Sequence, residues 1–322
     1  MTIAAISIVR NEEDIIEPFV RHNAAHVDYF LICDHASTDA TQSILRRLRA
    51  EGYPIFLYTV HGKAFRQGRW MTILAHEAKA LIPRLRYIAP LDADEFIFSR
   101  QGTLEQALES HFRRYGDPVC FLPWVTHAPM ADDDMTVQNP AQRIRHRLAR
   151  EPEPYNKIIL PARSIRFYLN IGPGSHGAAY LRHKLRGSRL RDVELCHFPV
   201  RSVDQVRRKV TEGSIACHEI QKRRPGVGNH WNQLKMLFEA ENPAMRDITE
   251  IARRYIGGER PEDIGIVASD FRYMDDKPLP AGQSRLMLHG DYANHPRLVS
   301  MLRGWPGPED PARKFEPGPV PA

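Results

Sequence analysis

The sequence predicts an α/β fold, in which a mixed sheet is flanked by helices and followed by a mainly helical C-terminal part. Apolar runs of strand length alternate with helical patterns through about the first 125 residues, and polar or acidic residues follow successive runs. Such alternation favours parallel pairing, because a parallel connection needs a crossover that is usually a helix. The 322 residues, 42% of them hydrophobic, suffice for one large domain or two.

Three strand–helix units open the chain. The predicted strands are residues 3–9, 29–33 and 55–60. Three helices are predicted. The first opens with the acidic residues 12–14, and the other two span about residues 40–50 and 70–82. Carboxylates near a helix start interact favourably with the helix dipole, and Gly52 and Pro83 are typical helix stops.

A fourth apolar run, residues 87–91, leads into the acidic segment Asp92-Ala93-Asp94-Glu95. Buried carboxylates are costly unless they are paired or bind a metal. An Asp-x-Asp pair near a strand end places both side chains on the same side, and oxygen donors suit Mg²⁺ or Mn²⁺. A turn in which the aspartates cap backbone donors is the alternative interpretation.

Three of the predicted strand ends carry polar side chains: Asn11-Glu12, residues 34–39 and residues 92–95. In parallel sheets, ligands bind at the carboxyl ends of the strands. Helix caps and turns explain each group singly but explain the three together less well, so the pattern favours a nucleotide site.

The later chain changes in character. A helix over residues 103–115 and a strand over 119–125 are followed by residues 141–191, which hold twelve Lys or Arg against Glu151 and Glu153. Apolar stretches at 158–160, 167–169 and 193–195 predict an antiparallel or mixed extension of the sheet, and residues 203–255 read as helical. We expect a catalytic domain over 1–210 (halves 1–125 and 126–210), a helical extension over 211–303 and a proline-rich tail over 304–322.

The formal charge of +6 and the pI near 9.2 favour anionic partners. No signal peptide and no run of about 20 apolar residues is visible, so we expect a cytoplasmic protein, with basic residues available for peripheral contact with the inner face of the cell membrane. The four cysteines are too few and too scattered for a disulfide scaffold.

The motifs Ile8-Val9-Arg10-Asn11-Glu12-Glu13, Asp34-His35-Ala36-Ser37-Thr38-Asp39-Ala40-Thr41 and Leu91-Asp92-Ala93-Asp94-Glu95-Phe96 together resemble family 2 glycosyltransferases of the GT-A fold. The resemblance is greatest to the Glyco_tranf_2_4-like bacterial subgroup. It covers about the first 125 residues well and continues more weakly to Lys209. Typical members have a second acid where His35 stands, and processive members carry a Gln-x-x-Arg-Trp motif that this chain lacks. A single-addition enzyme is therefore expected.

The resemblance implies an inverting enzyme that transfers a sugar from a nucleotide diphosphate to a hydroxyl of a glycan or lipid-linked acceptor. UDP is the first candidate for the nucleotide. Asp92 and Asp94 would hold Mn²⁺ or Mg²⁺. His197, or His176 as second choice, would complete the set of metal ligands. The implied nucleotide-sugar pocket is lined by Asn11, Glu12, Asp34, Asp39 and Asp92, with Lys157, Arg201 and Lys209 on the diphosphate. The general base is unassigned among Asp132, Asp133, Asp134, Asp192 and Glu194, and no nucleic acid is expected.

Two other functions stay open. A sugar-phosphate nucleotidyltransferase would use a related fold and metal, although Arg10-Asn11-Glu12-Glu13 stands where such enzymes usually have a glycine-rich loop. A non-catalytic basic module for an anionic polymer predicts more aromatic residues among the basic ones than residues 141–191 contain. Gly172–Gly177 matches G-x-G-x-x-G, but it does not follow the first strand, so we interpret it as a flexible acceptor-side loop.

Overall fold

The structure is a computed structural model, and it describes residues 1–60, 67–116, 119–152, 155–181, 183–221, 229–240, 243–257 and 264–275. The predicted tail at 304–322 and much of the predicted helical extension lie outside these residues.

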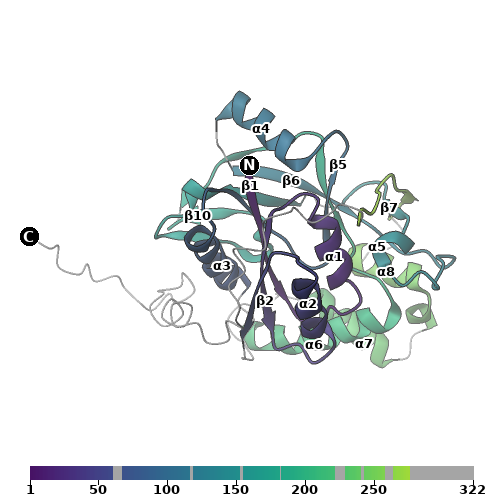
Figure 1. Ribbon diagram of the computed structural model, residues 1–322. Coiled ribbons are helices and arrows are strands. Elements are labelled where there is room, and N and C mark those ends of the chain that lie inside the picture. Colours follow the sequence, from purple (N-terminus) through teal and green to yellow (C-terminus); the bar gives the residue numbers. More distant parts are fainter. Residues whose placement is uncertain are drawn as a thin grey trace, which may run out of the picture.

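A nine-stranded mixed sheet forms the centre of the described fold, with strand order β3-β2-β1-β4-β8-β6-β13-β5 and β12 added beside β6 (Figure 1). Its strands are β1 (Thr2–Val9), β2 (Tyr29–His35), β3 (Ile55–Val60), β4 (Leu85–Pro90), β5 (Glu95–Ser99), β6 (Val119–Thr126), β8 (Asn156–Pro161), β12 (Gly187–Arg189) and β13 (Val193–His197).

The first four strands pair in parallel, and helices cover both faces of this half. The helices are α1 (Ile16–Asn23), α2 (Thr41–Ala50) and α3 (Gln67–Leu81). Alternate residues of β1 enter different cores: Ile3 packs in the core that contains α1 and α2, whereas Ala4 packs in the core that contains α3. A strand buried on both faces reads as a continuous apolar run, which is why β1 could be found in the sequence.

The second half of the sheet is mixed. Strand β8 lies antiparallel between β4 and β6, and β13 pairs parallel with β6 and antiparallel with β5. Helix α4 (Leu104–Tyr115) follows β5 and begins with a capping box, in which Thr103 and Gln106 satisfy each other's backbone N–H groups. This arrangement brings the ends of β4, β6 and β13 and the starts of β5 and β8 to one edge of the sheet.

The sheet must curl to accommodate the link between β4 and β5. In a flat sheet these strands would stand four spacings apart, about 19 Å. The five steps from Pro90 to Glu95 reach at most about 18 Å when fully extended, yet the link is a turn in which Glu95 N–H donates to the carbonyl of Asp92. Residues 91–94 therefore close a curled half of the sheet.

Smaller elements complete the described chain. They are α5 (Pro140–Arg143), β7 (His146–Leu148), β9 (Leu169–Ile171), β10 (Ala178–Tyr180), β11 (His183–Lys184), α6 (Val203–Gln221), α7 (Asn229–Glu239), α8 (Ile248–Gly257) and β14 (Ile266–Ala268). Helices α6, α7 and α8 gather at the lower right of Figure 1 and share a small core that includes Val206 and Ile251.

The predicted fold class is confirmed: the structure has a curled mixed sheet with helices on its faces. The predicted strand over 55–60 coincides with β3, and the other early strands agree within a few residues. The helix expected to open at residues 12–14 begins at Ile16, because residues 12–15 form a turn instead. Helix α6 runs across the predicted boundary between residues 210 and 211, and the domain division stays a prediction.

Candidate active site

The candidate site lies where the strand order changes direction. The chain proceeds from β1 outward to β2 and β3 and then returns to β4 on the other side of β1. Ligands of open α/β sheets bind at such a switch point, outside the carboxyl ends of the strands. Here Asn11 and Glu12 follow β1, and Asp92 and Asp94 follow β4.

A buried lysine anchors the acidic turn. Lys157, at the start of β8, has no exposed side-chain surface, and its Nζ lies 2.7 Å from Asp92 Oδ2 and 3.0 Å from Glu95 Oε2. Burial acts to lower the pKa of Lys157, but the two carboxylates outweigh it and raise that pKa. Burial raises the pKa of Glu95 to about 8, against the opposing effect of Lys157. The turn is therefore held by an internal ion pair.

Asp94 is only 4% exposed and is surrounded by cationic groups. Its Oδ2 lies 3.0 Å from Lys209 Nζ, 3.6 Å from His197 Nε2 and 3.6 Å from an Arg201 guanidinium nitrogen. Burial acts to raise the pKa of Asp94, but Lys209, His197 and Arg201 hold it well below its usual value. Asp94 is therefore ionised in the site and is the residue on which its charges converge.

Arg201 belongs to the interior of this network. It is 1% exposed, and it donates to Asp14 from Nε over 2.7 Å, to Glu12 over 2.6 Å and to the carbonyl of Phe198 over 3.2 Å. Burial raises the pKa of Glu12 to about 7, although Arg201 and Lys209 oppose the shift. Arg201, predicted to contact a diphosphate, thus donates its hydrogen bonds to protein groups. Lys209, in contrast, keeps 24% of its side chain exposed.

His197, at the end of β13, is oriented by a tryptophan. The Trp124 and His197 rings are stacked with 4.3 Å between centroids and 3° between planes, and Trp124 Nε1 donates to Glu95 Oε1 over 2.8 Å. His176 meets the edge of the same indole at 5.2 Å, while its Nδ1 lies 2.9 Å from the carbonyl of Asn156. Both candidate histidines therefore border the acidic turn, and His197 is the one beside Asp94.

The predicted nucleoside residues lie at the ends of β1 and β2. Asn11 has φ 54°, accepts from Thr38 N–H over 2.8 Å and donates to Glu212 over 2.8 Å. Asp34 is fully buried, and its Oδ1 has no hydrogen-bond partner in the described chain. Asp39 accepts from the N–H and hydroxyl of Thr41 at the start of α2. Asp34 therefore offers a buried acceptor, whereas Asp39 supports the local turn.

The residues present match a divalent cation in part. The 3.6 Å between Asp94 Oδ2 and His197 Nε2 suits two ligands of one ion, because adjacent ligands at about 2.1 Å from a metal stand about 3.0–3.6 Å apart. Asp92 does not join them, since Gln67 and Lys157 occupy its two oxygens. No group of three or more His, Cys, Asp or Glu in the described residues is placed to hold a metal. The two donors fit an ion that takes its remaining ligands from water or from a bound molecule.

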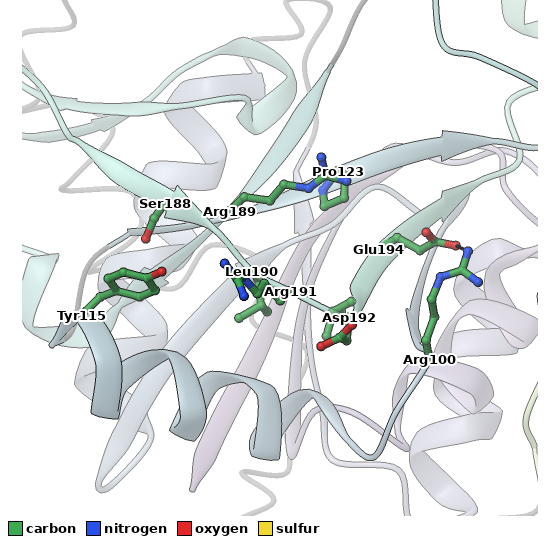
Figure 2. Close-up of a pocket in the computed structure, with 10 residues that line it drawn as sticks. Arg100, Tyr115, Pro123, Ser188, Arg189, Leu190, Arg191, Asp192 and Glu194 are labelled. Atoms are coloured by element: carbon green, nitrogen blue, oxygen red, sulfur yellow. Dashed lines mark hydrogen bonds and ion pairs between the residues drawn. The ribbon is translucent and has the colours of Figure 1, made fainter.

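Among the described residues, no hydrogen bond or ion pair joins a candidate general base to Asp92 or Asp94. Asp132 and Asp134 are exposed, and Asp133 is tied to the N–H of Met130. Asp192 and Glu194 line a separate pocket of about 540 Å³ with Arg189 and Arg191 (Figure 2). That pocket adjoins the first residues of β13, whereas His197 ends the strand, about 13 Å away.

Four site residues escaped the sequence analysis. The sequence indicates for Trp124 only that it belongs to a strand, and Gln67 lies outside any motif. Glu212 bonds Asn11 from across the chain, and Glu151 accepts from Thr126, the residue paired with His197 in the sheet. Their signal is spatial: each becomes visible only when strands distant in sequence are brought together.

No helix in the described part of the chain is long and apolar enough to span a membrane. No protein-family model matches the chain, and no curated protein sequence matches it.

Among solved structures, the chain is similar to 4-diphosphocytidyl-2C-methyl-D-erythritol synthase from Anaerococcus prevotii, with TM-score 0.27, 12% identity and coverage of 50% of this chain and 70% of that one. It is also similar to a mannosyltransferase from Pyrobaculum calidifontis in complex with GDP-Man and Mn²⁺, with TM-score 0.26, 18% identity and coverage of 40% and 35%. For glucosyl-3-phosphoglycerate synthase from Mycobacterium tuberculosis with Mn²⁺, UDP and phosphoglyceric acid, the TM-score is 0.26, the identity 17% and the coverage 38% and 43%.

The chain thus spans less than half the length of the two glycosyltransferase structures.

Proposed function

We propose that the protein is a metal-dependent glycosyltransferase of the family 2 type, which transfers a sugar from a nucleotide diphosphate to a hydroxyl acceptor with inversion. One observation carries the proposal. At the switch point between β1 and β4, a buried, ionised aspartate stands among cationic side chains and beside an imidazole. A diphosphate leaving group needs nearby cationic groups, because negative charge develops on it during transfer.

Asp94 and His197 would hold the divalent cation, Mn²⁺ or Mg²⁺, and Asp92 would bind the ribose or a metal-bound water. The ion would supply Lewis-acid stabilisation of the departing diphosphate. Lys209, which is partly exposed, would contact a phosphate oxygen, whereas Lys157 would keep Asp92 in position. Arg201 would act through Glu12, Asp14 and Asp94, to which it is already paired.

The nucleoside would lie over the ends of β1 and β2. Asp34 Oδ1 is buried without a partner among the described residues, and buried polar atoms normally have one. A ribose hydroxyl or a base amino group would satisfy it. Asn11, Glu12 and Asp39 would shape the same pocket, Asp39 by fixing the turn before α2.

Calorimetry with UDP in the presence and absence of Mn²⁺ tests the proposal. We expect metal-dependent binding by the parent chain and loss of at least tenfold in affinity for Asp94→Asn. The matched control is Asp204→Asn, whose side chain is 94% exposed and which should bind as the parent does. Absence of metal-dependent binding to UDP, GDP and CMP alike would contradict the proposal.

A hydrolysis screen over UDP-, GDP- and CMP-sugars then defines the reaction. Release of free nucleoside diphosphate from a UDP- or GDP-sugar, lost in Asp94→Asn, is the expected result. Formation of pyrophosphate from a nucleoside triphosphate and a sugar phosphate would instead identify a nucleotidyltransferase and overturn the assignment.

A further inference from the structure

The open end of the hairpin formed by β9 and β10 carries three exposed apolar side chains, here called the hairpin patch: Phe167, Tyr168 and Leu181. Their exposed fractions are 74%, 48% and 58%. Leu181 N–H donates to the carbonyl of Tyr168 over 3.3 Å, and the rings of Phe167 and Tyr168 meet edge to face at 4.8 Å. The three side chains therefore form one projecting cluster and are not scattered surface residues.

The stretch of sequence that contains the hairpin patch carries charge of one sign. From residue 154 to residue 191 the chain contains eight Lys or Arg and no Asp or Glu. Arg166, Lys184 and Arg186 adjoin the patch in sequence, are exposed, and form no ion pair within the described residues. Positive residues beside exposed aromatic side chains complement an anionic lipid surface.

We propose that the hairpin patch docks on an anionic membrane surface. Phe167, Tyr168 and Leu181 enter the headgroup region, where an aromatic ring with a polar edge is favoured. Arg166, Lys184 and Arg186 contact lipid phosphates. Leu181 adopts φ 53° at the end of the hairpin, and its side chain is 58% exposed.

Docking in this way would place the candidate site close to the membrane. The closed end of the same hairpin, residues 172–177, contains His176, and each strand of the hairpin is three residues long, or about 10 Å. If the proposed function holds, the acceptor hydroxyl would therefore be presented from a lipid-linked molecule. This last step rests on the proposed function, but the docking itself does not.

Sedimentation of the full chain with vesicles tests the docking. The vesicles contain phosphatidylcholine alone or with about one quarter phosphatidylglycerol, and no nucleotide is added. We expect binding to the anionic vesicles only, and its loss at about 0.5 M NaCl, where charges are screened within a few ångströms. Phe167→Ser should weaken binding about tenfold, since it removes one buried aromatic ring, and Lys184→Gln about fivefold, the effect of one charge at the surface.

Matched controls remove the same kinds of group elsewhere. Met135→Ser alters a side chain that is 59% exposed and Arg46→Gln removes an exposed charge, and neither should change vesicle binding. Leu181→Asn, which tolerates the positive φ, provides a second apolar variant. Equal binding to neutral vesicles, absence of binding, or parent-like binding by Phe167→Ser and Leu181→Asn would each overturn the proposal. Self-association lost in Phe167→Ser, without vesicle binding, would assign the patch to a second copy of the chain instead. UDP binding is measured separately, so a failure of the catalytic proposal is distinguishable.

Discussion

The indole ring of Trp124 lies flat against the imidazole of His197, with 4.3 Å between their centroids. The same indole donates to Glu95, which is fully buried and lies one residue after Asp94. The acidic turn therefore fixes Trp124, and Trp124 fixes the ring that faces Asp94. Groups that orient a metal ligand in this way affect binding without touching the ion.

Trp124→Leu should lower the Mn²⁺-dependent affinity for UDP by about tenfold or more, the usual effect of removing a group that orients a metal ligand. Calorimetry measures the affinity, and a melting curve shows whether the variant is folded. Trp70→Leu, in α3, is the control for loss of a partly buried tryptophan. Parent-like affinity in folded Trp124→Leu would show that His197 does not depend on the stack.

Lys209→Met should change the binding of metal and nucleotide in opposite directions. The Lys209 ammonium lies 3.0 Å from Asp94 Oδ2 and competes with any other cation for that oxygen. Its removal should raise the affinity for Mn²⁺ alone and lower that for UDP, each by about tenfold, the effect of one hydrogen bond to a charged group. Lys235→Met, which loses a pair on the surface of α7, is the control. A fall in both affinities would contradict the competition.

Lys157→Met should destabilise the fold, because it removes the buried cation that Asp92 and Glu95 share. Removing one member of a buried ion pair costs about 3 kcal/mol, whereas the exposed pair lost in Lys235→Met is worth less than about 1 kcal/mol. Urea unfolding measures the difference. Adding Glu95→Gln to Lys157→Met should restore part of the stability, and a double variant less stable than the single one would refute the pairing.

His22 should make the fold sensitive to mild acid. Its Nε2 donates to the carbonyl of Ile97 and its Nδ1 accepts from Met274 N–H, so the buried ring is neutral, and burial lowers its pKa to about 4. Above pH 6.5 the His22 ring is neutral in both the folded and the unfolded chain. As the pH falls from 6.5 towards 4, the unfolded chain binds a proton that the folded chain excludes, which costs about 2 kcal/mol between pH 7 and pH 5.

Urea unfolding at several pH values checks this effect. His22→Gln, which can keep both hydrogen bonds, should flatten the dependence, whereas His183→Gln at an exposed position should leave it unchanged. An unchanged slope in His22→Gln would place the acid sensitivity in other groups, such as His127, whose pKa burial lowers to about 3.

The parallel half of the fold was predictable because each element carries its own pattern. Strand β1 is apolar except for Thr2 and Ser7, and Gly52 and Pro83 mark where helices stop. The acidic turn was also found, and the chain order places it at the carboxyl end of β4. Such features are local, and a window of ten residues contains them.

The pairing within the site was not predictable, since it depends on residues far apart. Arg201 contacts Asp14 across 187 positions, and Lys157 contacts Asp92 across 65. In the sequence both cations look like members of a basic surface. Only the placement of β8 beside β4, and of β13 beside β6, buries them among carboxylates.

The short link between β4 and β5 has a further consequence. Residues 91–94 close the curled sheet by joining β4 to β5, and the same residues form the proposed ligand-binding turn. A ligand in the site would then protect distant parts of the sheet from forced unfolding and from amide hydrogen exchange. Amide protons of β5 and β13, which pair along Glu95–Ser99, should exchange more slowly when the site is filled, although most of them never meet a ligand.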